Sequence, residues 1–197
     1  MVTAVAERAG EAMDSEIIRG SWQAPDRFGE LYHRYATVLY GYACQRVGTA
    51  EAEDLVAETF LAAFAQRHRY DLKRSSAKPW LFGILTNKIA RHSRSERIHY
   101  RGYARSWQAP VVDGVDERIV EQVTARAQRA RLATALCRLS RADRSVLLLV
   151  AWGQLSYDEV AEAMSIPVGT VRSRLNRARR KVREALDDGT DYNGDDS

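Results

Sequence analysis

Residues 168–183 combine a narrow apolar stripe with a dense array of basic side chains. The apolar residues recur at intervals of three and four, so they occupy one face of an α-helix: Val171, Leu175, Ala178 and Val182. Between Arg172 and Arg183 there are seven Lys or Arg residues and no acidic residue. Like charges on successive helical turns repel one another, so an exposed helix without a ligand explains this composition poorly. The segment predicts an amphipathic helix whose outer faces bind a polyanion.

A shorter helix is predicted immediately before this one. Ser156, with Glu159 three residues later, has the capping-box pattern that begins a helix. Ser165 and Pro167 then interrupt the helical pattern before the basic helix starts. Two short helices across a tight turn, the second of them basic, form the helix-turn-helix arrangement that reads the major groove of DNA.

The leading end of the basic helix carries residue types suited to reading base edges. Short side chains there permit close approach, and the guanidinium of Arg174 can donate two hydrogen bonds to a guanine. We expect arginines farther along the helix to contact phosphates, which adds affinity but little sequence preference. The residues predicted to bind DNA here are Gly169, Thr170, Arg172, Ser173, Arg174, Arg177 and Arg180.

A second basic segment, residues 66–105, lies in the other half of the chain. It holds eleven Lys or Arg residues against two acidic residues, although the net charge of the whole chain is only +4. Within it, an apolar stripe beginning at Pro79 predicts a helix. Trp80 falls on this stripe, which favours a core role for its ring over the alternative of stacking on a DNA base. A polar loop before this helix and a basic outer face suit a single nucleic-acid strand. The residues predicted to bind DNA here are Lys73, Arg74, Ser75, Ser76, Asn87, Lys88, Arg91 and Arg94.

The segment 49–64 predicts a helix with an acidic outer face. Asp54 and Glu58 are four residues apart and share that face, whereas Leu55 and Phe60 belong to the buried side. Taken alone, such a face is usually an ordinary solvated surface. It is also a candidate for contact with a basic partner helix, through Asp54, Leu55, Glu58 and Phe60.

Helical periodicity runs through most of the chain and the alternating pattern of strands is missing, which predicts an all-α fold of two small helical domains. The expected parts are a flexible N-terminal extension (1–25), a first domain (26–104), a flexible linker (105–118), a second domain (119–186) and a disordered acidic tail (187–197). No segment reads as a membrane helix or a secretion signal, so we expect a cytoplasmic protein without membrane insertion.

Three groups of residues carry a resemblance to a known family. Residues 155–162, 166–175 and 177–179 closely resemble region 4 of sigma-70-family factors, and they look most like the extracytoplasmic-function (ECF) group. Residues 52–60 resemble region 2.2, and residues 78–88 resemble regions 2.3 and 2.4. Two positions depart from the family pattern: Ser165 stands where the turn usually holds Gly, and Ala57 where many relatives carry Gln.

The resemblance implies an ECF sigma factor that binds core RNA polymerase and directs promoter recognition, DNA opening and transcription initiation at a specific regulon. Region 4 would read the upstream element of promoter DNA, at about −35. Region 2 would dock on the polymerase through 52–60 and capture the non-template strand of the proximal element, at about −10. The resemblance also suggests an anti-sigma factor as a regulatory partner.

Two other classes of function compete with this interpretation. A stand-alone helix-turn-helix regulator would require a dimer and a palindromic site, and the first domain has no pattern for dimerisation or ligand sensing. An enzyme would require a motif that is missing here, such as a phosphate-cradling glycine loop or a nucleophile with its base. Cys44 and Cys137 lack metal-type spacing and fit small core positions. We expect no catalytic residue, cofactor or metal.

Overall fold

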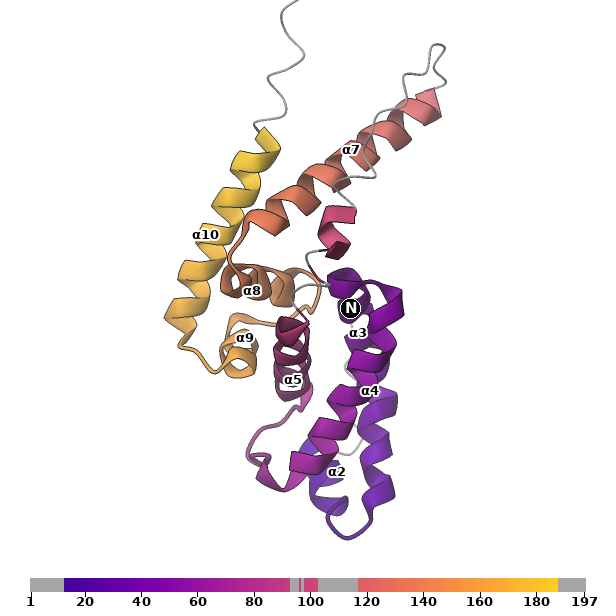
Figure 1. Ribbon diagram of the computed structural model, residues 1–197. Helices are drawn as coiled ribbons and strands as arrows, with labels where there is room; N and C mark the ends of the chain where they lie inside the picture. Colours follow the sequence, from indigo (N-terminus) through magenta and orange to yellow (C-terminus); the bar gives the residue numbers. More distant parts are fainter. Residues whose placement is uncertain (1–12, 93–95, 97, 103–116, 188–197) are drawn as a thin grey trace, which may run out of the picture.

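The computed structural model describes residues 13–92, 96, 98–102 and 117–187, with the backbone alone for residues 117–127. Within these residues every regular element is helical, which confirms the predicted all-α fold (Figure 1). The elements are α2 (Asp14–Gly20), η2 (Pro25–Phe28), α3 (Gly29–Val47), α4 (Thr49–Gln66), η3 (Arg67–Arg69), α5 (Lys78–Arg91), α7 (Glu117–Arg138), α8 (Arg141–Ala151), α9 (Tyr157–Met164) and α10 (Val168–Asp187). Arg94, most of the predicted linker and the tail beyond Asp187 lie outside the described residues.

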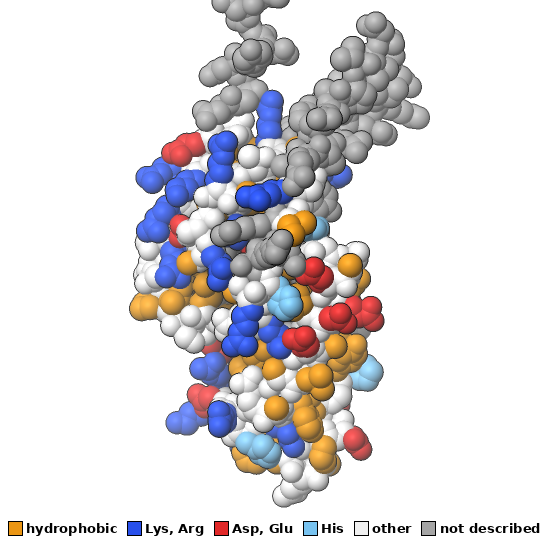
Figure 2. Space-filling view, in the orientation of Figure 1, with side chains coloured by type: hydrophobic (Ala, Val, Ile, Leu, Met, Phe, Trp, Pro, Cys, Tyr) orange, Lys and Arg blue, Asp and Glu red, His pale blue; other side chains and the backbone are white. Residues whose placement is uncertain are grey.

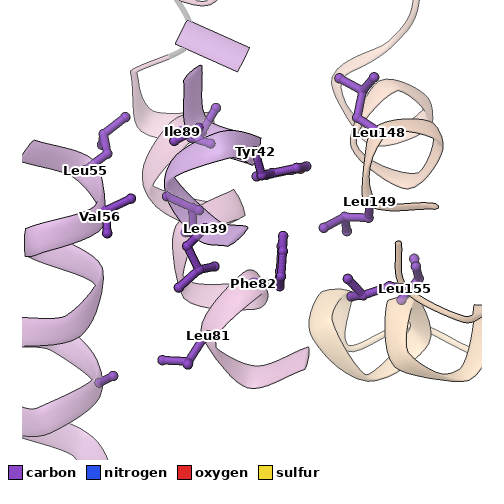
Figure 3. Close-up of a cluster of buried hydrophobic side chains, with 14 of the residues drawn as sticks. Leu39, Tyr42, Leu55, Val56, Leu81, Phe82, Ile89, Leu148, Leu149 and Leu155 are labelled. Carbon is purple, nitrogen blue, oxygen red and sulfur yellow. The ribbon is translucent and has the colours of Figure 1, made fainter. Parts of the chain in front are cut away.

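Helices α3, α4 and α5 pack together and form the core of the first domain. Apolar side chains from all three helices meet there, among them Leu39, Leu55 and Leu81 (Figure 3). The chain reverses between α3 and α4 at Gly48, whose φ of 90° is a conformation that favours glycine. The packing of these three helices sets the position of the basic α5 against the acidic α4.

The structure differs from the expected flexible extension at residues 14–20, which form helix α2. Ile17 and Ile18 of this helix are fully buried in the first domain. The Ser21 hydroxyl then donates to the Ile18 carbonyl at 2.7 Å and ends the helix. A helix this short has too few turns to show a period in the sequence, so packing against the first domain decides its structure.

The second domain consists of α7, α8, α9 and α10. The predicted cap of α9 is confirmed, because Ser156 Oγ accepts from the Glu159 N–H and Glu159 Oε2 accepts from the Ser156 N–H. Ser165, after α9, has φ 51° and ψ 47°, which is the left-handed conformation. Serine costs about 1 kcal/mol more than glycine in this conformation, so the turn is retained at a modest cost in stability.

The two domains pack directly against each other through α5 and α9 (Figure 1). The helices approach so closely that a Cβ atom added to Gly83 would lie 2.5 Å from the carbonyl oxygen of Ala163. Phe82 of α5 faces Leu149 and Leu155 of the second domain, and the buried apolar residues form one continuous core (Figure 3). The fold therefore carries both basic segments on a single compact body.

Candidate nucleic-acid interface

The basic face of α10 is exposed because its apolar face is buried. Val171, Leu175 and Ala178 are at most 1% exposed, and they pack into the second domain. Lys and Arg side chains consequently gather over α10 on the outer surface (Figure 2). Of the residues predicted to bind the upstream element, the structure leaves Gly169, Arg172, Ser173, Arg177 and Arg180 exposed and Thr170 and Arg174 half-buried.

Two arginines of this face have acidic partners. Arg177 Nη1 donates to Asp143 Oδ1 at 3.3 Å, and the Asp143 side chain at the start of α8 is only 3% exposed. Arg180 Nε lies 3.6 Å from Glu184 Oε1 in an exposed pair, which a phosphate can replace at little cost. Asp143 therefore fixes the direction of Arg177, a contact between residues 34 positions apart that local sequence patterns do not reveal.

The second candidate surface begins in the loop formed by residues 71–77, between η3 and α5. Lys73 and Ser75 are exposed in this loop. Arg74 is also exposed but pairs with Glu162 of α9 at 2.5 Å. Ser76 is half-buried, and its Oγ accepts from the Lys78 N–H at 3.2 Å. Of the four loop residues predicted to bind DNA, Lys73 and Ser75 are thus exposed, Arg74 is exposed but paired, and Ser76 is half-buried.

Helix α5 continues this surface. Asn87 and Arg91 are exposed, whereas Lys88 donates to Glu58 Oε2 of α4 at 2.8 Å. Trp80 is half-buried and packs against the core with its ring centroid 4.9 Å from that of Tyr70, as predicted. Together, the loop and helix expose the basic side chains of Lys73 and Arg91 and the polar side chains of Ser75 and Asn87.

The acidic face predicted on α4 is exposed, and its apolar anchors are buried. Asp54 and Glu58 are exposed, while Leu55 is 2% and Phe60 7% exposed. The hydrogen bond from Lys88, together with its charge, lowers the pKa of the Glu58 carboxyl below its ordinary value. Because Lys88 and Glu58 touch, the acidic face of α4 and the basic face of α5 are adjacent.

An apolar surface that the sequence does not predict lies beside the acidic face. Tyr32 and Tyr40 of α3 are 48% and 40% exposed and line a groove with Glu53 and Ala57 of α4, and Leu61 of α4 is 69% exposed. Large apolar side chains gathered on a surface favour contact with another protein. Their only sequence signal is that α3 carries more apolar residues than a single buried stripe requires.

Metal clusters, disulfides and membrane-spanning helices are absent from the described residues. None of their His, Cys, Asp and Glu side chains form a group that could hold a metal ion. Cys44 and Cys137 are half-buried and are not joined in a disulfide. Along the part of the chain that the structure describes, no helix is both long and apolar enough to span a bilayer.

Comparison with known proteins assigns both domains to one family. The family model for sigma-70 region 2 matches residues 31–98, and the model for sigma-70 region 4 matches residues 126–182. The ECF RNA polymerase sigma factor SigL of Mycobacterium tuberculosis is 34% identical over 158 residues, which cover 79% of this chain and 86% of SigL. The RNA polymerase sigma factor CnrH of Cupriavidus metallidurans is 31% identical over 188 residues, which cover 92% of this chain and 96% of CnrH.

Solved structures agree with this assignment. CnrH in complex with the cytosolic domain of CnrY has a TM-score of 0.64 at 25% identity, covering 90% of this chain and 99% of that chain. The sigma factor RpoE of Bartonella quintana, in complex with the anti-sigma factor NepR, shares the fold with a TM-score of 0.55 at 24% identity, covering 82% and 98%. The chain belongs to the sigma-70 family of RNA polymerase sigma factors, in the extracytoplasmic-function group, and directs transcription initiation.

Proposed function

We propose that the two basic surfaces of this sigma factor bind two separate elements of one promoter. The leading end of α10 reads base edges of the upstream element, with Arg174 in contact with bases and Arg177 and Arg180 on phosphates. The 71–77 loop and α5 hold the non-template strand of the proximal element once the duplex has opened. The observation that carries this proposal is that each family-matched domain exposes its own basic surface.

As a sigma factor, the protein binds core RNA polymerase and is not itself an enzyme. We propose that the exposed carboxylates of Asp54 and Glu58 make this contact, supported from beneath by the buried Leu55 and Phe60. The neighbouring apolar side chains of α3 would extend the same contact. This assignment separates the polymerase-binding surface on α4 from the DNA-binding surface on α5, although the two surfaces meet at the Glu58–Lys88 pair.

The same comparisons support two further proposals, on regulation and on location. We propose that an anti-sigma factor binds this protein, since CnrH has been seen in complex with the cytosolic domain of CnrY and RpoE with NepR. We further propose that the protein acts in the cytoplasm, on one specific regulon. The proposed domains are residues 26–104, against which helix α2 packs, and residues 119–186, joined by residues 105–118.

Gel filtration with purified core polymerase provides the first test. The protein should co-elute with the polymerase, whereas a stand-alone helix-turn-helix regulator should elute separately. Run-off transcription from a library of random promoters should then yield transcripts that share an upstream and a proximal element. The proposal is refuted if the protein co-elutes but selects only one element, or selects none.

A further inference from the structure

A buried carboxylate on α2 holds the end of the 71–77 loop. Asp14 is 2% exposed, although the sequence predicts a flexible extension for the segment that contains it. Asp14 Oδ2 accepts a hydrogen bond from the Ala77 N–H at 2.6 Å and another from the Tyr35 hydroxyl at 2.5 Å. The Arg34 guanidinium donates to the other carboxylate oxygen and balances its charge.

The same loop is fixed at a second point close to the first. The Tyr70 hydroxyl donates to the Ser76 carbonyl at 3.0 Å, and the Tyr35 hydroxyl lies 3.4 Å from Ser76 Oγ. Burial, followed by the hydrogen bond to Asp14, raises the pKa of Tyr35 to about 12, so this hydroxyl keeps its proton at neutral pH. Ser76 and Ala77 are therefore held rigidly, while Lys73 and Ser75 project from the loop into solvent.

We infer that Asp14 is a positioning residue for capture of the separated DNA strand. The inference rests on the proposed function of the 71–77 loop. Ordering a loop in its binding conformation during folding removes an entropic cost from the binding step. Asp14 lies outside the residues matched by the region 2 model, which begin at residue 31, so α2 adds a support that this match does not include.

The chemistry of the site explains why a carboxylate is required there. A single side chain must accept from one backbone N–H and one hydroxyl while neutralising a guanidinium. Asparagine retains an oxygen that can accept from Ala77 but loses the charge that pairs with Arg34. Alanine loses both, and leaves the buried Ala77 N–H without its acceptor.

The test measures the affinity of polymerase holoenzyme for fork-junction DNA, in which the proximal element is single-stranded. The sequence of that element is first selected from a random pool with the wild-type protein. Asp14→Ala should weaken fork-junction binding by about tenfold, and the affinity of Asp14→Asn should lie between those of Asp14→Ala and the wild type. Core-polymerase affinity and binding of an upstream-element duplex should stay unchanged, which a general loss of structure would not allow. Asp26→Asn, which removes an exposed carboxylate near α2, should behave as the wild type.

Each result has one interpretation. Wild-type affinity for fork-junction DNA in Asp14→Ala would overturn the inference, as would equal weakening of fork-junction and upstream-duplex binding. If Asp14→Ala does not fold, as judged by circular dichroism, Tyr35→Phe decides instead: it should weaken only fork-junction binding, and wild-type behaviour would overturn the inference. A wild-type holoenzyme with no preference for any single-stranded sequence would refute the proposed function itself.

Discussion

Glu96 and Arg144 form an ion pair between the two domains, with Arg144 Nη2 2.9 Å from Glu96 Oε2. Neither side chain is more than 3% exposed. The other carboxylate oxygen of Glu96 accepts from Nε of Arg46, a fully buried residue of α3, at 2.6 Å. One buried carboxylate therefore pairs with two buried guanidinium groups, one from each domain.

Replacing Glu96 with Gln should lower the free energy of unfolding by about 3–5 kcal/mol, because both guanidinium groups would stay buried without a counter-charge. Urea denaturation followed by circular dichroism measures this loss. Glu58→Gln is the matched control, since it removes a carboxylate from the exposed pair with Lys88 and should cost little. Equal losses of unfolding free energy in the two variants would show that burial does not increase the contribution of Glu96 to stability.

Gly83 should tolerate no side chain while α5 and α9 remain packed. A Cβ at this position would lie 2.5 Å from the Ala163 carbonyl oxygen, so Gly83→Ala should force the domains apart and destabilise the protein by about 1–3 kcal/mol. Gly41→Ala, at an exposed position of α3 with no atom within 4 Å of the added Cβ, should instead be slightly stabilising. Thermal denaturation of both variants tests the contrast, and a stabilised Gly83→Ala variant would contradict the close packing.

Stability should fall as the pH rises above 10, partly because of Tyr35. Its pKa is about 12 in the folded protein, against an ordinary value of 10.0, so the folded state holds this proton more tightly than the unfolded state. The contribution is complete below pH 10 and is lost as the pH approaches 12. In Tyr35→Phe, the urea midpoint should fall less steeply between pH 10 and pH 12 than in the wild type. An equally steep fall in the variant would show that Tyr35 does not contribute to this pH dependence. Burial also raises the pKa of Tyr70, so some pH dependence should remain.

Local patterns predicted the longer helices, but neither the short helix α2 nor the contacts between distant parts of the chain. The period of Val171 and Leu175 predicted α10, and the cap at Ser156 predicted the start of α9, because both signals lie within a few residues. Asp14 meets Ala77 across 63 positions, and no local pattern indicates that pairing. Val38 has the spacing of the buried stripe of α3 yet is 48% exposed, because α4 and α5 cover only part of that helix.

Arg174 and Arg180 should differ in how they affect binding of the upstream element. Arg174→Ala should relax base preference at one position, with a loss of about 1–3 kcal/mol for the preferred base. Arg180→Ala should weaken binding to all sequences alike and reduce the slope of log affinity against log salt by about one. Holoenzyme binding to a panel of single-base promoter variants at several salt concentrations separates the two effects. Uniform weakening by both substitutions would contradict a base-reading role for Arg174.

Asn87 should act after recognition, when the strands separate. Its amide is exposed on α5 and offers both a donor and an acceptor to an extruded base. Asn87→Ala should slow opening of a duplex promoter by about tenfold, the effect of losing one or two hydrogen bonds, and leave upstream-element affinity unchanged. Fluorescence of a base analogue in the proximal element reports opening directly. Gln45→Ala, which removes an exposed amide from α3 instead, should open DNA at the wild-type rate. A wild-type rate of opening in Asn87→Ala would show that Asn87 does not bind the separated strand. A loss of upstream-element affinity as large as the loss in opening rate would contradict its proposed role in the same way.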